Sequence, residues 1–199
     1  IAIDIGTTTV VTSLIDRENG RELANASMIN AQKHFGLDVL TRITYEYEHP
    51  ETGVKELQEA IVKSIDGMIE EVCAEAGKDS GEVREIVVAA NCTMLHMLLG
   101  VDARALGRAP YKPEFTDART VTAKEIGIRK APEALLYCLP SVSAYIGADI
   151  VAGAYVCELQ KKRGNVLFID IGTNGEIVLA ADGRILCCSC AAGPALEGM

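Results

Sequence analysis

Apolar runs alternate with turn residues at the start of the chain. The ranges 1–5, 10–15 and 21–29 are apolar or β-branched, and the ranges 6–9 and 16–20 between them are rich in Gly, Thr, Asp and Asn. This spacing predicts three strands joined by tight turns, a β-meander. The ranges 85–90 and 135–139 have a similar character, and we expect both to be strands. The stretch 101–132 shows little periodicity, and we expect it to be irregular, with one strand near Thr120.

Helical periodicity is clearest over 54–76. Its apolar residues recur at three- and four-residue steps and so share one face: Val54, Leu57, Ile61, Ile65, Met68, Ile69 and Val72. Gly77 is a typical helix stop. Shorter helices are expected over 93–99 and 147–159, and a solvated turn over 161–164. Strands that alternate with helices indicate an α/β fold.

The opening pattern recurs late in the chain. Ile3-Asp4-Ile5-Gly6-Thr7 is identical to the segment 169–173, and in both places a second strand, a turn and a third strand follow. The pair Asp182-Gly183 is a strong hairpin signal. Because the two copies lie in the same strand-and-turn context, the sequence predicts a duplicated lobe rather than a short repeat.

The repeated segment has a definite chemical use. Glycine lets the backbone approach a ligand closely, and successive N–H groups with threonine hydroxyls can bind phosphate oxygens. An aspartate at the strand end can hold hydrated Mg²⁺. A single copy is more simply a β-turn with a capping aspartate. Two copies in matching context favour a clamp on a polyphosphate.

Composition narrows the function classes. The chain has 199 residues and a formal net charge of −9, so it lacks the basic surface that binding to nucleic acid or an anionic membrane requires. No apolar run is long enough to span a bilayer. Seven irregularly spaced cysteines suggest reduced thiols and a cytoplasmic location. The chain opens directly on a strand without Met and stops in a glycine-rich segment, so we expect it to be part of a longer polypeptide.

Two motifs resemble those of a known superfamily. Asp4-Ile-Gly-Thr-Thr-Thr9 is similar to the first phosphate motif of the acetate and sugar kinase, heat-shock chaperone and actin group, and Asp170-Ile-Gly-Thr-Asn-Gly-Glu176 is similar to its second. The range 147–153 stands where that group has its first connecting helix. The resemblance implies an actin-like (ribonuclease H-like) ATPase lobe over 1–160 and the start of a second, duplicated lobe over 161–199.

A narrower resemblance extends over nearly the whole chain. Several segments in order are similar to the reductive activators of corrinoid proteins: Asn91-Cys-Thr-Met-Leu-His96, Leu106-Gly-Arg-Ala-Pro110, Gly147-Ala-Asp149, Gly172-Thr-Asn-Gly-Glu176 and Ala191-Ala-Gly-Pro-Ala-Leu-Glu-Gly198. That family uses ATP and Mg²⁺ to help return a Co(II) corrinoid protein to Co(I), with the electron passing through a [2Fe–2S] cluster in a preceding domain. The resemblance therefore implies a corrinoid protein as partner, and a homodimer is one candidate assembly. It places the adenosine-binding motif beyond Met199.

The candidate site residues follow from the two motifs. Asp4 and Asp170 are expected to position Mg²⁺ and phosphate, acting largely through water, and are candidate catalytic and metal-binding residues. Candidate phosphate contacts and close-approach positions are Thr7, Thr8, Thr173 and Asn174, with Gly6, Gly172 and Gly175.

Asp149 is the third candidate catalytic residue. It can orient the attacking water or act as a base, or it can simply favour the dipole at the start of a helix; the sequence leaves both open. Glu176 is undecided between the site and solvent.

Other reactive side chains receive structural interpretations. Cys187, Cys188 and Cys190 match neither a zinc pattern nor a ferredoxin pattern, and we expect them to be small residues of a buried strand. His96 lies among apolar neighbours and is expected to be a core histidine. Two other functions remain open for the same fold: a small-molecule phosphotransferase, which needs a substrate pocket between the lobes, and a chaperone-like or filament-forming ATPase.

Overall fold

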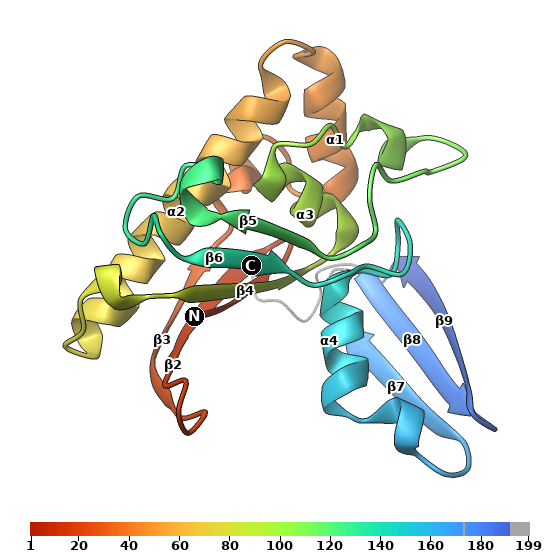
Figure 1. The fold of residues 1–199 in the computed structure, drawn as a ribbon. Coiled ribbons are helices and arrows are strands. Elements are labelled where there is room, and N and C mark those ends of the chain that lie inside the picture. The colour runs from red at the N-terminus through yellow and green to blue at the C-terminus, as the bar shows by residue number, and fades with distance from the viewer. Residues whose placement is uncertain (173, 192–199) are drawn as a thin grey trace.

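The computed structural model describes residues 1–172 and 174–191 and contains two β-sheets (Figure 1). The first sheet has six strands in the order β3-β2-β1-β4-β6-β5, and the second has three in the order β7-β8-β9. The strands of the first sheet are β1 (Ala2–Ile5), β2 (Thr9–Ile15), β3 (Glu22–Ile29), β4 (Glu85–Ala90), β5 (Arg119–Thr122) and β6 (Leu135–Cys138). The helices are α1 (Val39–Glu48), α2 (Gly53–Glu75), α3 (Cys92–Leu99) and α4 (Ala148–Val156).

Strands β1, β2 and β3 form the predicted antiparallel meander. Strand β4 pairs in parallel with β1, and β6 pairs in parallel with β4. Strand β5, which includes Thr120, is antiparallel to β6 at the edge. The α/β prediction is confirmed, and so is each strand predicted for this part of the chain. The stretch 101–132 contains only β5 and the short 3₁₀ turns η3 (Arg104–Gly107) and η4 (Ala123–Ile126).

Helix α2 crosses one face of the meander and contributes much of the main core. Six of the seven residues of its predicted stripe are buried, and Val54 at the start is partly buried. Leu57, Ile65 and Ile69 are fully shielded, and the stripe packs in one cluster with Ile3 and Ile5 of β1. Burying apolar surface of this extent is the dominant favourable contribution to folding. The apolar period of the sequence therefore identified the correct face of this helix.

The sequence analysis did not predict α1. This helix begins with a capping box between Asp38 and Thr41 and places Arg42, Ile43 and Glu46 on its buried face. Because two of these three buried residues are charged, the apolar period on which helix recognition depends is interrupted. The segment between β3 and α1 includes the 3₁₀ turn η1 (Ala31–His34).

The second sheet consists of β7 (Val166–Ile171), β8 (Asn174–Ala181) and β9 (Arg184–Ala191). Asp182 and Gly183 have φ values of 49° and 75°, the left-handed geometry of the predicted hairpin. Helix α4 covers one face of β7 and β8 through a small cluster that includes Ile150, Val178 and Phe168. Helix α4 ends at Val156 and is therefore shorter than the helix predicted over 147–159. After it, Glu158 adopts a left-handed conformation before η5 (Leu159–Lys161).

The three cysteines of β9 correct one prediction. They lie on a strand, as expected, but Cys187, Cys188 and Cys190 are exposed rather than buried. Strand β9 is the edge of its sheet. The covering cluster of α4 draws on Val178 and Ala180 of β8 and not on β9.

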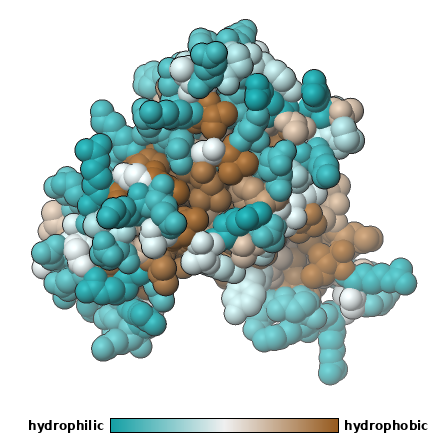
Figure 2. Space-filling view, turned by 45° about the horizontal axis from the view of Figure 1, so that its top comes forward, coloured by the Kyte–Doolittle hydropathy of each residue, from teal (hydrophilic) through white to brown (hydrophobic). Residues whose placement is uncertain are grey.

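The two copies of the repeat differ in their surroundings. Ile3 and Ile5 are 3% and 0% exposed beneath α2, whereas the equivalent Ile169 and Ile171 are 50% and 65% exposed. Leu167, Ile185 and Leu186 of the second sheet are exposed as well. In Figure 2 apolar side chains reach the surface both in the middle of the view and at its right. Among the described residues, no helix has the length and apolar character needed to cross a bilayer.

This difference gives a matched test of the core. Ile5→Ala is expected to lower the free energy of unfolding by about 2–4 kcal/mol, because it leaves a cavity in a closed core. Ile171→Ala removes the same atoms from the same motif and is expected to cost less than about 1 kcal/mol. Urea denaturation of the chain measures both, and equal losses would contradict the assigned burial.

Candidate functional site

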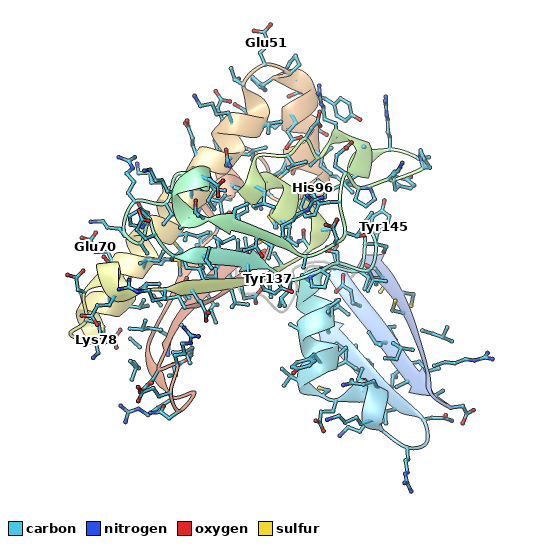
Figure 3. All side chains as sticks on the ribbon, in the orientation of Figure 1. Glu51, Glu70, Lys78, His96, Tyr137 and Tyr145 are labelled. Atoms are coloured by element: carbon cyan, nitrogen blue, oxygen red, sulfur yellow. The ribbon has the colours of Figure 1, made fainter. Side chains whose placement is uncertain are left out.

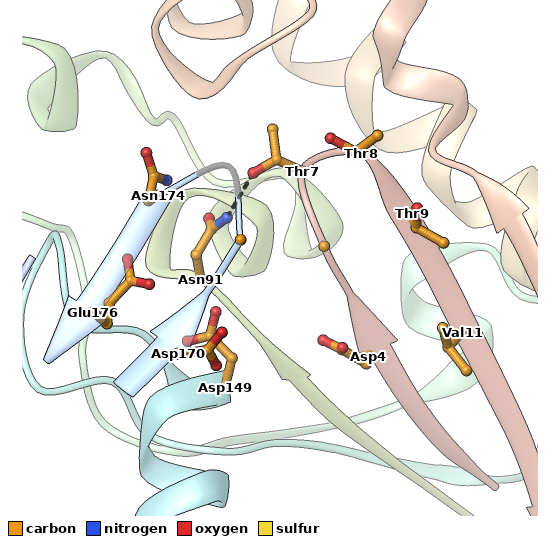
Figure 4. A pocket seen from close by; sticks show the side chains of 12 residues that line it. Asp4, Thr7, Thr8, Thr9, Val11, Asn91, Asp149, Asp170, Asn174 and Glu176 are labelled. Carbon is orange, nitrogen blue, oxygen red and sulfur yellow. Dashed lines mark hydrogen bonds between the residues drawn. The ribbon is translucent and has the colours of Figure 1, made fainter. Parts of the chain in front are cut away.

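Both Asp-Ile-Gly-Thr segments contribute to one cavity of about 330 Å³ (Figure 4). One wall is the turn between β1 and β2, and the opposite wall is formed by β7 and β8. The residue before α3 and the first turn of α4 close the cavity between them. Its lining residues are Asp4, Gly6, Thr7, Thr8, Thr9, Val11, Asn91, Asp149, Asp170, Gly172, Asn174 and Glu176.

The structure brings most of the predicted site residues to this cavity. Gly175 is buried in β8 and lies outside the lining, and Thr173 falls outside the described residues. Every other predicted site residue is in the lining. Glu176, which the sequence left undecided, also lines the cavity. The sequence analysis did not select Thr9, Val11 or Asn91; the available signal for Asn91 was its position directly after a buried strand and before a helix.

A tight turn shapes the first wall. The Gly6 N–H donates to the Thr9 carbonyl at 2.9 Å. A Cβ atom on Gly6 would lie 2.7 Å from that oxygen, so the turn cannot accept a side chain there without moving. In the second copy, the Gly172 N–H donates to the Asn174 carbonyl at 3.0 Å. Both walls therefore present tight turns to the same space.

The carbonyl groups of the first turn accept hydrogen bonds from two residues outside the cavity lining, Asn30 and Arg42. The Asn30 side-chain amide donates to the Gly6 carbonyl at 2.9 Å, and the Asn30 backbone N–H donates to the Thr8 carbonyl at 2.8 Å. Arg42 Nη2 donates to the Thr7 carbonyl at 2.6 Å. Since the N–H of each peptide points opposite to its C=O, these bonds direct the next N–H groups away from Asn30 and Arg42.

Asn91 contacts both the turn of the first wall and the start of α4. Its Oδ1 accepts from the Met94 N–H at 2.9 Å, which caps α3, and its Nδ2 donates to Thr7 Oγ1 at 3.2 Å. The backbone at Gly147 passes so close that a Cβ there would lie 2.5 Å from the Asn91 Cα. Helix α4 therefore begins against the end of β4, and its first turn delivers Asp149 to the cavity.

Carboxylates from both sheets and from α4 crowd the cavity. The pKa of Asp149 is raised to about 6, mainly by burial and further by the negative charges of Asp4 and Asp170, while a hydrogen bond from the Ile150 N–H opposes the rise. Burial and then Asp170 raise the pKa of Asp4 above its usual value. Burial also raises the pKa of Glu176, and Asp149 and Asp170 add to that effect. The cavity thus favours either protonation or a bound cation.

The donor set fits a hydrated hard cation. Within the described residues, no group of three His, Cys, Asp or Glu side chains is close enough to enclose a metal ion directly. Mg²⁺ keeps several of its waters and binds through one or two carboxylates plus phosphate oxygens. Asp4 and Asp170 face this space from the two sheets (Figure 4) and can hold such an ion through water.

His96 lies on α3, away from the cavity lining (Figure 3). Its side chain is fully buried, its Nδ1 lies 2.8 Å from the Cys92 carbonyl, and its Nε2 accepts from the Glu114 N–H at 3.2 Å. The ring stacks on Phe115 at 4.3 Å between centroids. Burial lowers its pKa, so it is neutral at pH 7, and the prediction of a core histidine is confirmed.

The electrostatics of Asp149 predict a stabilising substitution. Its pKa rises from 3.8 to about 6 on folding, so ionisation above pH 6 opposes folding. Asp149→Asn is therefore expected to raise the free energy of unfolding at pH 7 by about 1–2 kcal/mol, with the gain vanishing below about pH 4. Urea denaturation between pH 4 and 8 in EDTA measures this. Asp182→Asn, at an exposed turn, is the control, and a wild type more stable than Asp149→Asn at pH 7 would contradict the prediction.

Known proteins resemble the chain along its full length. The chain is 36% identical over 198 residues to the corrinoid activation enzyme RamQ of Eubacterium limosum and 28% identical over 207 residues to the [Co(II) methylated amine-specific corrinoid protein] reductase of Methanosarcina barkeri. It aligns along its whole length, but spans only 33% and 37% of these relatives. A solved reductive activator for corrinoid, iron-sulfur protein superposes with a TM-score of 0.94 at 41% identity, over 98% of this chain and 31% of that one.

Two family models cover nearly all of the sequence. Residues 164–199 match the C-terminal domain of RACo, the ASKHA domain, so the fold is of the actin-like type that the two phosphate motifs predicted. Residues 1–162 match the RACo middle region. The chain therefore belongs to the RACo family, the reductive activators of corrinoid proteins.

Proposed function

We propose that this chain is the phosphate-gripping part of an ATP-dependent reductive activator of a corrinoid protein. The observation that carries the proposal is the convergence of two Asp-Ile-Gly-Thr segments, 166 residues apart, on one cavity. The names of the relatives support the corrinoid partner. Because the chain spans about a third of their length, the reductive activity belongs to the whole polypeptide.

Bound Mg–ATP would supply a transferable phosphoryl group together with the cation that the crowded carboxylates favour. The turn 6–9 binds phosphate oxygens through its N–H groups and threonine hydroxyls, and Gly172 and Asn174 do so from the opposite wall. Asp4 and Asp170 would hold the cation. Asp149 lines the same cavity and has a pKa of about 6, so it can orient the attacking water and accept its proton.

In this proposal helix α4 transmits the nucleotide state of the cavity to the corrinoid partner, because it contacts both walls. This helix begins at Asn91 beside the first wall and packs along β7 of the second, with Gly153 directly against the Phe168 ring. Closing two walls around a polyphosphate moves one lobe relative to the other, as in other hinged domains. In the proposal this movement favours the one-electron step from Co(II) to Co(I). The electron comes from a low-potential donor through a [2Fe–2S] cluster in a separate domain, in the cytoplasm.

One observation favours a second candidate, a small-molecule phosphotransferase. A cavity of about 530 Å³ adjoins the phosphate cavity and shares Asn91, Asn174 and Glu176 with it. The apolar residues Leu40 and Tyr145 also line it. A kinase of this fold needs such an acceptor pocket between its lobes.

One assay separates the two functions. The full natural polypeptide is mixed with a Co(II) corrinoid protein and a low-potential reductant, and the absorption change from Co(II) to Co(I) is followed with and without Mg–ATP. The activator requires ATP to increase the Co(I) formed. If ATP makes no difference while a small-molecule acceptor becomes phosphorylated, the phosphotransferase is the function.

Charge at the two motif aspartates is expected to control ATP hydrolysis. Asp4→Asn and Asp170→Asn keep the side-chain shape but remove the charge that holds the cation, and each should lower the hydrolysis rate by about 10- to 100-fold. Asp182→Asn removes one charge from the same sheet at an exposed turn and should leave the rate unchanged. Phosphate release at saturating Mg²⁺ measures the effect, and full activity of both motif variants would exclude the assigned roles.

A further inference from the structure

Arg42 is a fully buried guanidinium that the proposed chemistry does not use. It lies on the inner face of α1 and is 0% exposed. Among the described residues, no carboxylate oxygen lies within ion-pairing distance of it, and the negative charge that favours its ionised form is that of Asp38, at the exposed start of the helix. Burial lowers its pKa only to about 10, so it stays charged at pH 7. A buried charge without a counter-ion is costly and is usually maintained for a reason.

The acceptors around Arg42 are all neutral. Its Nε donates to the Gly36 carbonyl at 2.9 Å, and its Nη1 lies 3.3 Å from Gln32 Oε1 and 3.2 Å from Met94 Sδ. Its Nη2 donates to the Thr7 carbonyl at 2.6 Å. The guanidinium therefore bridges the segment before α1 to the centre of the turn that forms the first wall of the cavity.

The bond to Thr7 fixes a peptide plane. Because C=O and N–H of one peptide point in opposite directions, holding the Thr7 carbonyl behind the turn directs the Thr8 N–H forward, into the cavity. The two flanking carbonyls are held by Asn30, but the central one is held by Arg42. Asn91 independently holds the Thr7 hydroxyl. Arg42 is thus a direct hydrogen-bond partner of the middle peptide.

The charge of Arg42 also acts on whatever occupies the cavity. The space in front of the turn is lined by four carboxylates, whereas Arg42 is a cation directly behind it. Because Arg42 is fully buried, its charge is screened less than a charge at the surface. Its positive charge polarises the Thr7–Thr8 peptide, and this favours binding of an anion at the Thr8 N–H.

We propose that Arg42 is a positioning residue for phosphate: it aims the central N–H of the first phosphate turn and supplies the cationic charge behind it, so that the turn selects a polyphosphate ligand. This inference rests on the proposed nucleotide function and adds a residue outside the cavity lining to that site.

The test separates positioning from mere support of the fold. In the full natural polypeptide, Arg42→Met keeps much of the buried volume and removes both charge and donors. The KM for ATP is expected to rise about tenfold or more, and so is the Kd for Mg–tripolyphosphate, which lacks adenosine. A purely structural role would reduce the active fraction, which lowers the apparent kcat and leaves KM unchanged.

Two further variants keep the result decisive. Arg104→Met removes a cation from η3, which is paired with Asp102 away from the turn, and should leave both constants unchanged. Arg42→Lys keeps the charge but not the planar fork, so its KM should rise about threefold or more. Should Arg42→Met fail to fold, a wild-type KM in Arg42→Lys overturns the inference. Failure of the wild type to bind ATP overturns the proposed function itself, whereas wild-type binding with an unaltered KM in Arg42→Met overturns this inference alone.

Discussion

The parallel pairing of β1 with β4 is the constraint on which the site depends. It aligns Ile5 with Ala90, so that the turn after β1 and Asn91 after β4 emerge at the same edge of the sheet. Ligands of α/β proteins bind at such carboxyl ends, where loops and helix starts converge. Asn91 then fixes the turn through Thr7, and the close passage of Gly147 fixes the start of α4 against it. The second sheet is placed in turn, since α4 packs on it.

The cavity that results is electrostatically unfavourable when it is empty. Its carboxylates are partly dehydrated and repel one another, which is visible in the raised pKa values of Asp4, Asp149 and Glu176. A cation and a polyphosphate together would relieve both the repulsion inside the cavity and the uncompensated cation behind it. Binding sites commonly carry such local strain, with the rest of the fold supplying the stability that the site lacks.

The sequence predicted what depends on apolar period and on repetition. The stripe of α2, the meander and the second copy of the motif were all visible, because each follows a simple spacing. Helix α1 was missed since its buried face includes Arg42 and Glu46, whose burial only the tertiary structure explains. The exposure of Cys187 was also unpredictable, because a strand pattern does not say whether another element covers it. For Asn91 the sequence showed only a polar residue between a buried strand and a helix, and its place in the site follows from the pairing of β4 with β1.

The order of the two clusters along the chain has a consequence for synthesis on the ribosome. The main cluster draws its buried residues from the first 148 positions, whereas the second cluster needs Val178 and Ala180 of β8. The first sheet and its helices can thus complete their packing while the chain is still emerging, and α4 is then in place for the later strands to pack on. Folding of this family member is expected to be vectorial, with the half of the site made by β1 and β4 formed before its opposite wall exists.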